Sequence, residues 1–148
     1  MAGTRLGIDA HDLDRLQLRL RVLASGIRDS RTLMPRLGGY LRDSTRERFK
    51  AQTDPDGGAW AVLQPHTLKR KRQNKDKILT QRGYLRRGIT YQVTAPGRVE
   101  VGSKLVYAAT HQFGRGNIPA RPFLGISRRD AEEINAIVRD WASEFGFN

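Results

Sequence analysis

The first part of the chain carries apolar residues at helical spacing. Leucine and isoleucine recur at intervals of three and four between Ala10 and Ile27, which places them on one stripe of a predicted helix: Leu13, Leu16, Leu20, Leu23 and Ile27. Asp9 or Asp12 can cap the start of this helix. The stripe fits either a helix that packs on its own domain or one that contacts another subunit.

A second helix is predicted from Met34 to Ala51. Pro35 suits its first turn, where the N–H group that proline lacks would have no helical partner. The positions expected to face the core follow at helical spacing: Leu37, Leu41, Thr45 and Phe49. A short turn separates the two helices, so we expect an antiparallel helical hairpin over residues 10–51.

The period changes to two in the middle of the chain. Ile89, Tyr91 and Val93 alternate with polar residues, a turn follows at residues 95–98, and Val99 and Val101 flank Glu100. This pattern predicts a β-hairpin with one buried face.

Two short helical stretches are predicted on either side of this hairpin. The first runs from Ile78 to Arg87, and the second runs from Leu105 to Gln112. We expect the second stretch to carry three apolar side chains into the core: Val106, Tyr107 and Phe113.

The last predicted helix covers residues 127–146. Ser127 and Asp130 have the spacing of a capping box, and an apolar stripe follows them: Ile134, Ile137, Val138, Trp141 and Phe145. The 148 residues, 38% of them hydrophobic, fit a single domain with a modest core. We therefore predict an α+β fold with an N-terminal helical hairpin, a small antiparallel β-sheet and a C-terminal helix packed on it.

Composition argues against disulfide-stabilised, thiolate-metal and membrane-spanning proteins. Cysteine is absent, which excludes disulfides and thiolate metal sites. No stretch approaches the roughly 20 apolar residues of a membrane span, and we expect no signal peptide from the first residues.

The net charge of +12 is unevenly distributed. Nine lysines and arginines but a single acid lie between Lys69 and Arg87, and residues 52–77 are expected to form an exposed basic loop. Its cations could neutralise DNA phosphates or an acidic partner: Lys69, Arg70, Lys71, Arg72, Lys75 and Lys77. A solvated loop that confers solubility is the alternative. No aromatic residue lies among these charges, which argues against stacking on single-stranded bases.

Catalytic and metal-binding patterns are missing from the sequence. The three histidines are scattered, and the chain has neither a nucleophile elbow nor a phosphate-binding glycine loop. Residues 54–58 resemble a calcium loop only superficially, because the glycine is misplaced and Pro65 stands where the bidentate glutamate belongs. We predict that the protein is not an enzyme and needs no cofactor or metal; a nuclease that uses Asp54 is the weakest alternative.

The segment from Gln112 to Gly125 is held by two prolines. Pro119 and Pro122 restrict the backbone of the residues before them, so the guanidinium of Arg121 is partly positioned in advance. Phe123 either fills the core beneath the last helix or contacts a neighbouring subunit. Arg121 fits a buried site and a subunit contact equally well, and Arg115 lies at a tip open to a neighbour.

A set of residues in a fixed order resembles a known family. The set begins with Arg48-Phe49, Gln52, residues 54–57 and Trp60, and continues with Thr67, Lys69, Ile78-Leu79, Gly83 and Leu85. It ends with Tyr107-Ala108, His111-Gln112-Phe113-Gly114 and the run from Ile118 to Gly125. Over residues 33–141 this order resembles the phage virion morphogenesis family of Mu-like and P2-like tailed bacteriophages, often called tail completion proteins.

The resemblance implies a late, non-enzymatic role in building a tailed particle. It implies a tail or neck component at the head–tail junction that acts as a homo-oligomeric ring, commonly sixfold. Implied partners are the tail tube or terminator protein and the head connector, with genomic DNA as a non-specific neighbour. The implied locations are the virion and, during assembly, the host cytoplasm. The alternative is a basic nucleic-acid-binding accessory protein.

Overall fold

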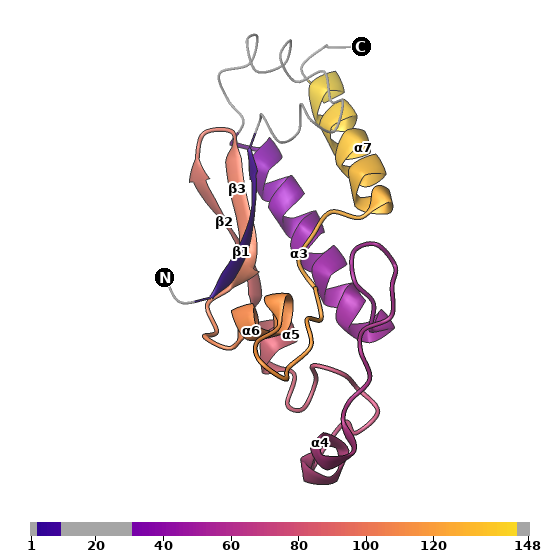
Figure 1. Cartoon of the computed structure of the whole chain (residues 1–148). Helices are drawn as coiled ribbons and strands as arrows, with labels where there is room; N and C mark the ends of the chain where they lie inside the picture. The colour runs from indigo at the N-terminus through magenta and orange to yellow at the C-terminus, as the bar shows by residue number, and fades with distance from the viewer. Residues whose placement is uncertain (1–2, 10–30, 145–148) are drawn as a thin grey trace.

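The computed structural model describes residues 3–9 and 31–144 (Figure 1). Its elements, in chain order, are β1 (Thr4–Asp9), α3 (Leu33–Ala51), α4 (Pro65–Arg70), α5 (Tyr84–Arg87), β2 (Ile89–Ala95), β3 (Arg98–Ser103), α6 (Ala108–Phe113) and α7 (Arg128–Glu144). The α+β class is therefore confirmed. The predicted helix over residues 10–27 and the last residues of the predicted C-terminal helix lie outside the described residues.

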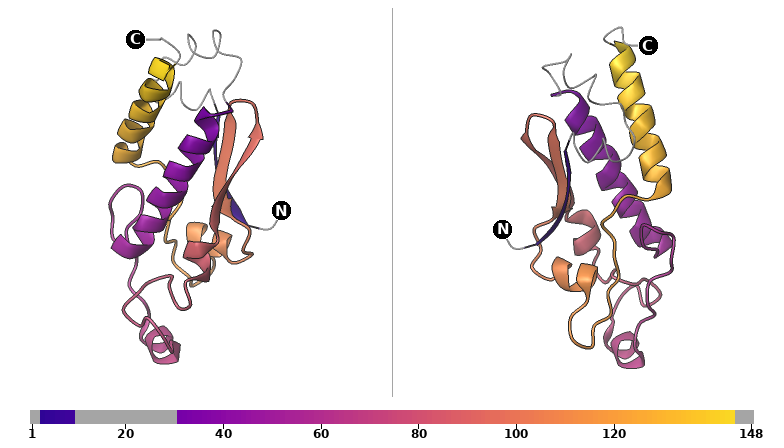
Figure 2. Two further views of the ribbon diagram at one scale, coloured as in Figure 1. Left: turned by 180° about the vertical axis from the view of Figure 1, so that it is seen from behind. Right: turned by 45° about the horizontal axis from the view of Figure 1, so that its top comes forward.

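Helix α3 is the centre of the fold. The sheet lies on one side of it and α7 lies on the other, so the molecule has three layers (Figures 1 and 2). Its buried positions include all four that the sequence pattern predicted: Leu37, Leu41, Thr45 and Phe49. They meet a core that draws on every layer, including Ile89, Val99, Phe123, Ile134 and Val138. No helix among the described residues has the length and apolar character needed to cross a membrane.

The predicted hairpin of β2 and β3 is confirmed, and it belongs to a three-stranded antiparallel sheet in the order β1-β3-β2. The buried face carries Ile89, Val99 and Val101. Strand β1 was not predicted. Its six residues contain a glycine, which is depleted in strands, and its partner residues Arg98–Ser103 lie about ninety positions further along the chain.

Helix α7 confirms the predicted C-terminal helix and its capping box. The Ser127 N–H donates to Asp130 Oδ2 at 2.8 Å, and the Asp130 N–H donates to Ser127 Oγ at 2.9 Å. The helix packs chiefly against α3, which lies between it and the sheet (Figure 1). Near its C-terminal end, Trp141 Nε1 donates to Thr32 Oγ1 at 2.8 Å, just before α3 begins.

The connecting segments differ from the prediction. The helix expected from Ile78 to Arg87 shortens to α5, because Leu79 and Gly83 both adopt a left-handed backbone, with φ of 55° and 75°. The loop expected over residues 52–77 contains α4.

The prediction that Val106, Tyr107 and Phe113 enter the core is wrong. Their exposed fractions are 75%, 43% and 72%. Residues four apart share one face of a helix, and the inner face of α6 carries Ala108 and Gln112, which leaves Phe113 outside.

Gly38 sets the distance between α3 and the sheet. A Cβ atom at this position would lie 2.5 Å from Tyr91 Cδ2 and 2.8 Å from Val99 Cγ2. Any side chain there would push helix and sheet apart. At Gly39, by contrast, the nearest atom to an added Cβ is Tyr91 Cε1 at 4.0 Å.

We therefore expect Gly38→Ala to lower the free energy of unfolding by about 1–3 kcal/mol through overpacking. Gly39→Ala is the matched control, because the same change on the same helix meets no clash and raises helix propensity by about 0.5–1 kcal/mol. Urea unfolding of both variants measures the difference. Equal stability of the two variants would contradict the close approach at Gly38.

Candidate interaction grooves

A buried ion pair joins the two long helices. Arg48 on α3 contacts Asp130 at the start of α7 through Nη2 and Oδ2, and their side chains are 7% and 2% exposed. Arg48 Nη1 also donates to the carbonyl oxygen of Phe123 at 2.9 Å. Tyr40 donates to the other oxygen of Asp130 at 2.9 Å. One cluster therefore positions α3, α7 and the segment before α7.

Burial acts on the titration of each member of this cluster. It lowers the pKa of Arg48, although the charge of Asp130 opposes that shift. Burial and the bond to Asp130 raise the pKa of Tyr40 to about 12. Burial also tends to raise the pKa of Asp130, but hydrogen bonds from Ser44 and Ser127 and the charge of Arg48 outweigh it, so the pKa falls below its ordinary value. Asp130 is thus held ionised opposite Arg48.

The proline-held segment is clamped by Gln112. Gln112 Oε1 accepts from the N–H groups of Phe123 and Leu124, both at 3.0 Å, and Nε2 donates to Leu124 O at 3.1 Å. Trp60 Nε1 donates to Pro122 O at 2.7 Å. These four bonds fix the position of the segment in front of α7.

Two of the three predicted subunit-contact residues lie inside the molecule. Phe123 is fully buried, with its ring centroid 5.4 Å from that of Phe49. Arg121 is 5% exposed and donates to Ala61 O at 2.7 Å and Val62 O at 3.0 Å, which ties down the segment after Trp60. Arg115 remains exposed at the tip of its turn. Of the three, Arg115 alone has an exposed side chain.

Helices α4, α5 and α6 lie toward one end of the molecule (Figure 1). A groove of about 850 Å³ opens among the segments at this end. Its walls are residues 63–71, residues 79–85 and parts of the segment 107–121. Lys71, Arg82 and Arg121 line it together with two histidines, and no carboxylate is among its lining residues. We call it the basic groove.

The predicted basic stretch divides into buried and exposed members at this groove. Lys71 is 8% exposed, and its Nζ donates to the carbonyl oxygens of Lys77 and Thr80, the latter at 2.9 Å. It therefore shapes the groove wall and is not the exposed cation that the sequence led us to expect. The remaining members of the stretch are exposed: Lys69, Arg70, Arg72, Lys75 and Lys77.

Apolar side chains gather at the same end. The large hydrophobic residues that the described part of the chain exposes are Val62, Leu68, Tyr84, Val93, Val106, Tyr107, Phe113 and Ile118. All except Val93 belong to the segments around α4, α5 and α6, and Tyr84, Tyr107 and Ile118 line the groove itself. Exposed apolar patches with polar surroundings are typical of protein interaction sites.

A second groove, of about 840 Å³, lies between the C-terminal half of α3, residues 53–57 and the start of α7. Its lining includes five carboxylates, from Asp43, Glu47, Asp54, Asp130 and Glu133. The cations that line it are Arg48, which is paired with Asp130, and Lys50 and Arg129. We call it the acidic groove. The lining thus has five carboxylates against three cations. Arg48 pairs with Asp130, Lys50 with Glu47, and Asp43 with Arg42, so the carboxylates of Asp54 and Glu133 make the groove weakly negative beside Arg129.

Neither groove has the arrangement of a catalytic or metal site. No three His, Asp or Glu side chains of residues 3–9 and 31–144 gather as metal ligands would. Asp54 Oδ1 accepts from the Gly58 N–H at 2.8 Å, which explains the aspartate as a turn former. Burial and the charge of Arg121 lower the pKa of His111, which lines the basic groove. The two grooves are therefore candidate binding surfaces, each with a defined shape and charge.

Comparison with known proteins gives a consistent set of relatives. The family model described as the phage virion morphogenesis family matches residues 11–143. Protein G of Escherichia phage Mu, whose name assigns it provisionally to capsid assembly, is 32% identical over 142 residues, covering 88% of this chain and 90% of the relative. Tail completion protein S of Escherichia phage P2 is 28% identical over 145 residues, covering 86% and 95%. A Mu-like prophage G protein of Haemophilus influenzae is 29% identical over 138 residues, covering 90% and 92%. No solved structure matches the chain.

The buried ion pair leads to a test of stability. We expect Asp130→Asn to lower the free energy of unfolding at pH 7 by about 3–5 kcal/mol, because it leaves the charge of Arg48 buried without a partner. Asp140→Asn, the same change at an exposed position of α7, is the control and should change little. Urea unfolding measures both.

Acid titration of the same variants separates the charge from the shape of the site. The unfolded carboxyl has a pKa of about 4, and the folded pKa of Asp130 is lower. The ionised Asp130 therefore adds to the free energy of unfolding above about pH 4, and this contribution is lost as the pH falls through the folded pKa. The wild-type chain should lose this part of its stability on acidification, and Asp130→Asn should not. Parallel acid profiles for the two would contradict the assignment.

Proposed function

The chain belongs to the phage virion morphogenesis family, and from this premise we propose that it completes the tail at the head–tail junction as part of an oligomeric ring. The family builds virions, so the protein is a structural component and not an enzyme.

The names of the relatives support a place between head and tail. The Mu relative is named for capsid assembly and the P2 relative for tail completion. A component of the junction contacts both assemblies, which accommodates the two names in one location. Its partners there would be other copies of itself, a tail tube or terminator protein and the head connector. It would reach the virion from the host cytoplasm.

The observation that carries the proposal is the surface at the α4, α5 and α6 end. Seven of the eight large apolar side chains that the described residues expose lie there, and three of them line the preformed basic groove. Residues of the motif set that resembles the family line this groove: Thr67, Leu79, Gly83, Leu85, Tyr107, His111 and Arg121. Exposed apolar patches of this kind mark interaction sites, which supports a subunit that covers this surface with a partner in an assembly.

Electron microscopy of particles made without this protein tests the proposal. We expect full heads and separate tails that fail to join, because the junction lacks a component. Supplying the wild-type chain to the mixture should restore joining. Complete particles in its absence would contradict a role at the junction.

The second candidate function, non-specific binding of nucleic acid, rests on the exposed cations of the basic stretch. A variant with Lys69, Arg70, Arg72, Lys75 and Lys77 changed to glutamine tests it, with Lys71 left in place because it is buried. If these cations contact DNA, duplex affinity should fall. The slope of log affinity against log salt should also lose about 0.9 for each phosphate contact removed. If the affinity and the salt slope are unchanged, these cations do not contact DNA, and the assembly role is the one candidate function that remains.

A further inference from the structure

We propose that the basic groove of one copy docks on the acidic groove of a second copy, so that successive subunits associate head to tail. This inference rests on the proposed ring and names the two surfaces that would close it. The occupant is a second copy of this chain.

The two grooves are separate surfaces of similar size. Their volumes are about 850 and 840 Å³, and no residue lines both. When two different patches of one protein meet, the interface is heterologous, and repetition of the same contact generates a closed ring or a filament. A self-complementary pairing of either groove with itself would instead bring like charges together.

Charge complementarity selects this pairing. Two copies that each carry a net charge of +12 repel one another, so a stable contact needs local attraction. Screening limits the general repulsion to about 8 Å at physiological salt, whereas charges inside an interface act at close range. The basic groove has no carboxylate in its lining, and the acidic groove has an excess of carboxylates in an otherwise basic protein. Complementary charge of this kind sets the register and excludes wrong partners.

The apolar side chains favour a protein over DNA in the basic groove. Tyr84, Tyr107 and Ile118 line it with exposed fractions of 54%, 43% and 43%. Contacts with a duplex are made mainly to phosphates by polar and charged groups, which would leave these side chains in water. Tyr40, Ala51 and Pro55 in the acidic groove provide non-polar atoms for them to contact.

Both grooves are formed before any partner arrives. Arg121 and Lys71 hold the walls of the basic groove through bonds to carbonyl oxygens, and the pair of Arg48 with Asp130 holds α7 against α3 at the acidic groove. A preformed surface loses little conformational freedom on association, which favours binding.

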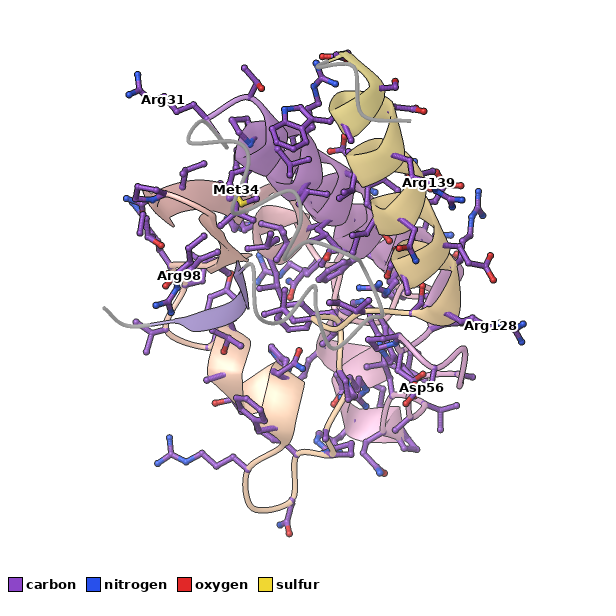
Figure 3. All side chains as sticks on the ribbon, turned by 90° about the horizontal axis from the view of Figure 1, so that it is seen from above. Arg31, Met34, Asp56, Arg98, Arg128 and Arg139 are labelled. Atoms are coloured by element: carbon purple, nitrogen blue, oxygen red, sulfur yellow. The ribbon has the colours of Figure 1, made fainter. Side chains whose placement is uncertain are left out.

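Single charge reversals on the full-length chain test the pairing. Arg82→Glu changes the basic groove, and Glu133→Lys changes the acidic groove; both side chains are exposed. Each should weaken self-association by about tenfold or more, because it places like charges across the interface. The matched controls are Arg139→Glu and Glu132→Lys, which make the same changes on exposed positions of α7 outside both grooves. Figure 3 shows Arg139 pointing away from the body of the molecule.

The double variant Arg82→Glu with Glu133→Lys is the decisive sample. It exchanges the charges on both sides of every contact, so association should recover toward the wild-type level, which a misfolded protein could not do. Light scattering coupled to size-exclusion chromatography, at low and high salt, measures the association of all five variants and the wild-type chain, alone and with purified tails.

Each other outcome has a definite meaning. If the wild-type chain forms rings that both reversals leave intact, or if the double variant fails to recover, the groove pairing is wrong while the ring stands. If Arg82→Glu abolishes duplex binding without affecting self-association, the basic groove serves DNA and the inference is overturned. A wild-type chain that stays monomeric in every condition, tails included, removes the ring and the inference together.

Discussion

The rest of the structure depends on the ion pair between Arg48 and Asp130. Both side chains are almost fully buried, and an ionised pair persists in such a place only if its remaining hydrogen-bonding positions are satisfied. Tyr40 and the Ser127 N–H bond the carboxylate, and the carbonyl of Phe123 accepts from the guanidinium. The pair thus fixes α3, α7 and the segment between α6 and α7 in one arrangement, because displacement of any of them would leave a buried charge without its partner.

Around this pair, side chains that bond to the backbone replace regular secondary structure. The chain between α6 and α7 has no helix or strand, yet Gln112 satisfies three of its polar groups and Trp60 a fourth. Arg121 in turn holds the carbonyls of Ala61 and Val62. Irregular segments far apart in sequence therefore have defined positions, and these bonds fix part of the wall of the basic groove.

This construction explains how a small domain can carry two shaped surfaces. The core lies between the sheet, α3 and α7, and the segments at its far end present a groove with apolar and basic residues. The acidic groove is placed by the same helices that bury the ion pair. A subunit whose contact surfaces are held by its own core can add to an assembly without refolding, which suits a component of a virion.

The sequence by itself determined the elements whose signal is local. Spacing predicted α3 and its four buried positions, alternation predicted the β2–β3 hairpin, and Ser127 with Asp130 predicted the start of α7. The order of motif residues identified the family. Tertiary structure alone decided the rest. Strand β1 forms through pairing with a strand about ninety residues away. Arg121 and Phe123 point inward because Arg121 donates to the carbonyl oxygen of Ala61 and the ring of Phe123 packs against that of Phe49. Asp130 was expected only as a cap, and Lys71 as an exposed cation. Their burial depends on contacts between segments far apart in the chain, which no local pattern of residues records.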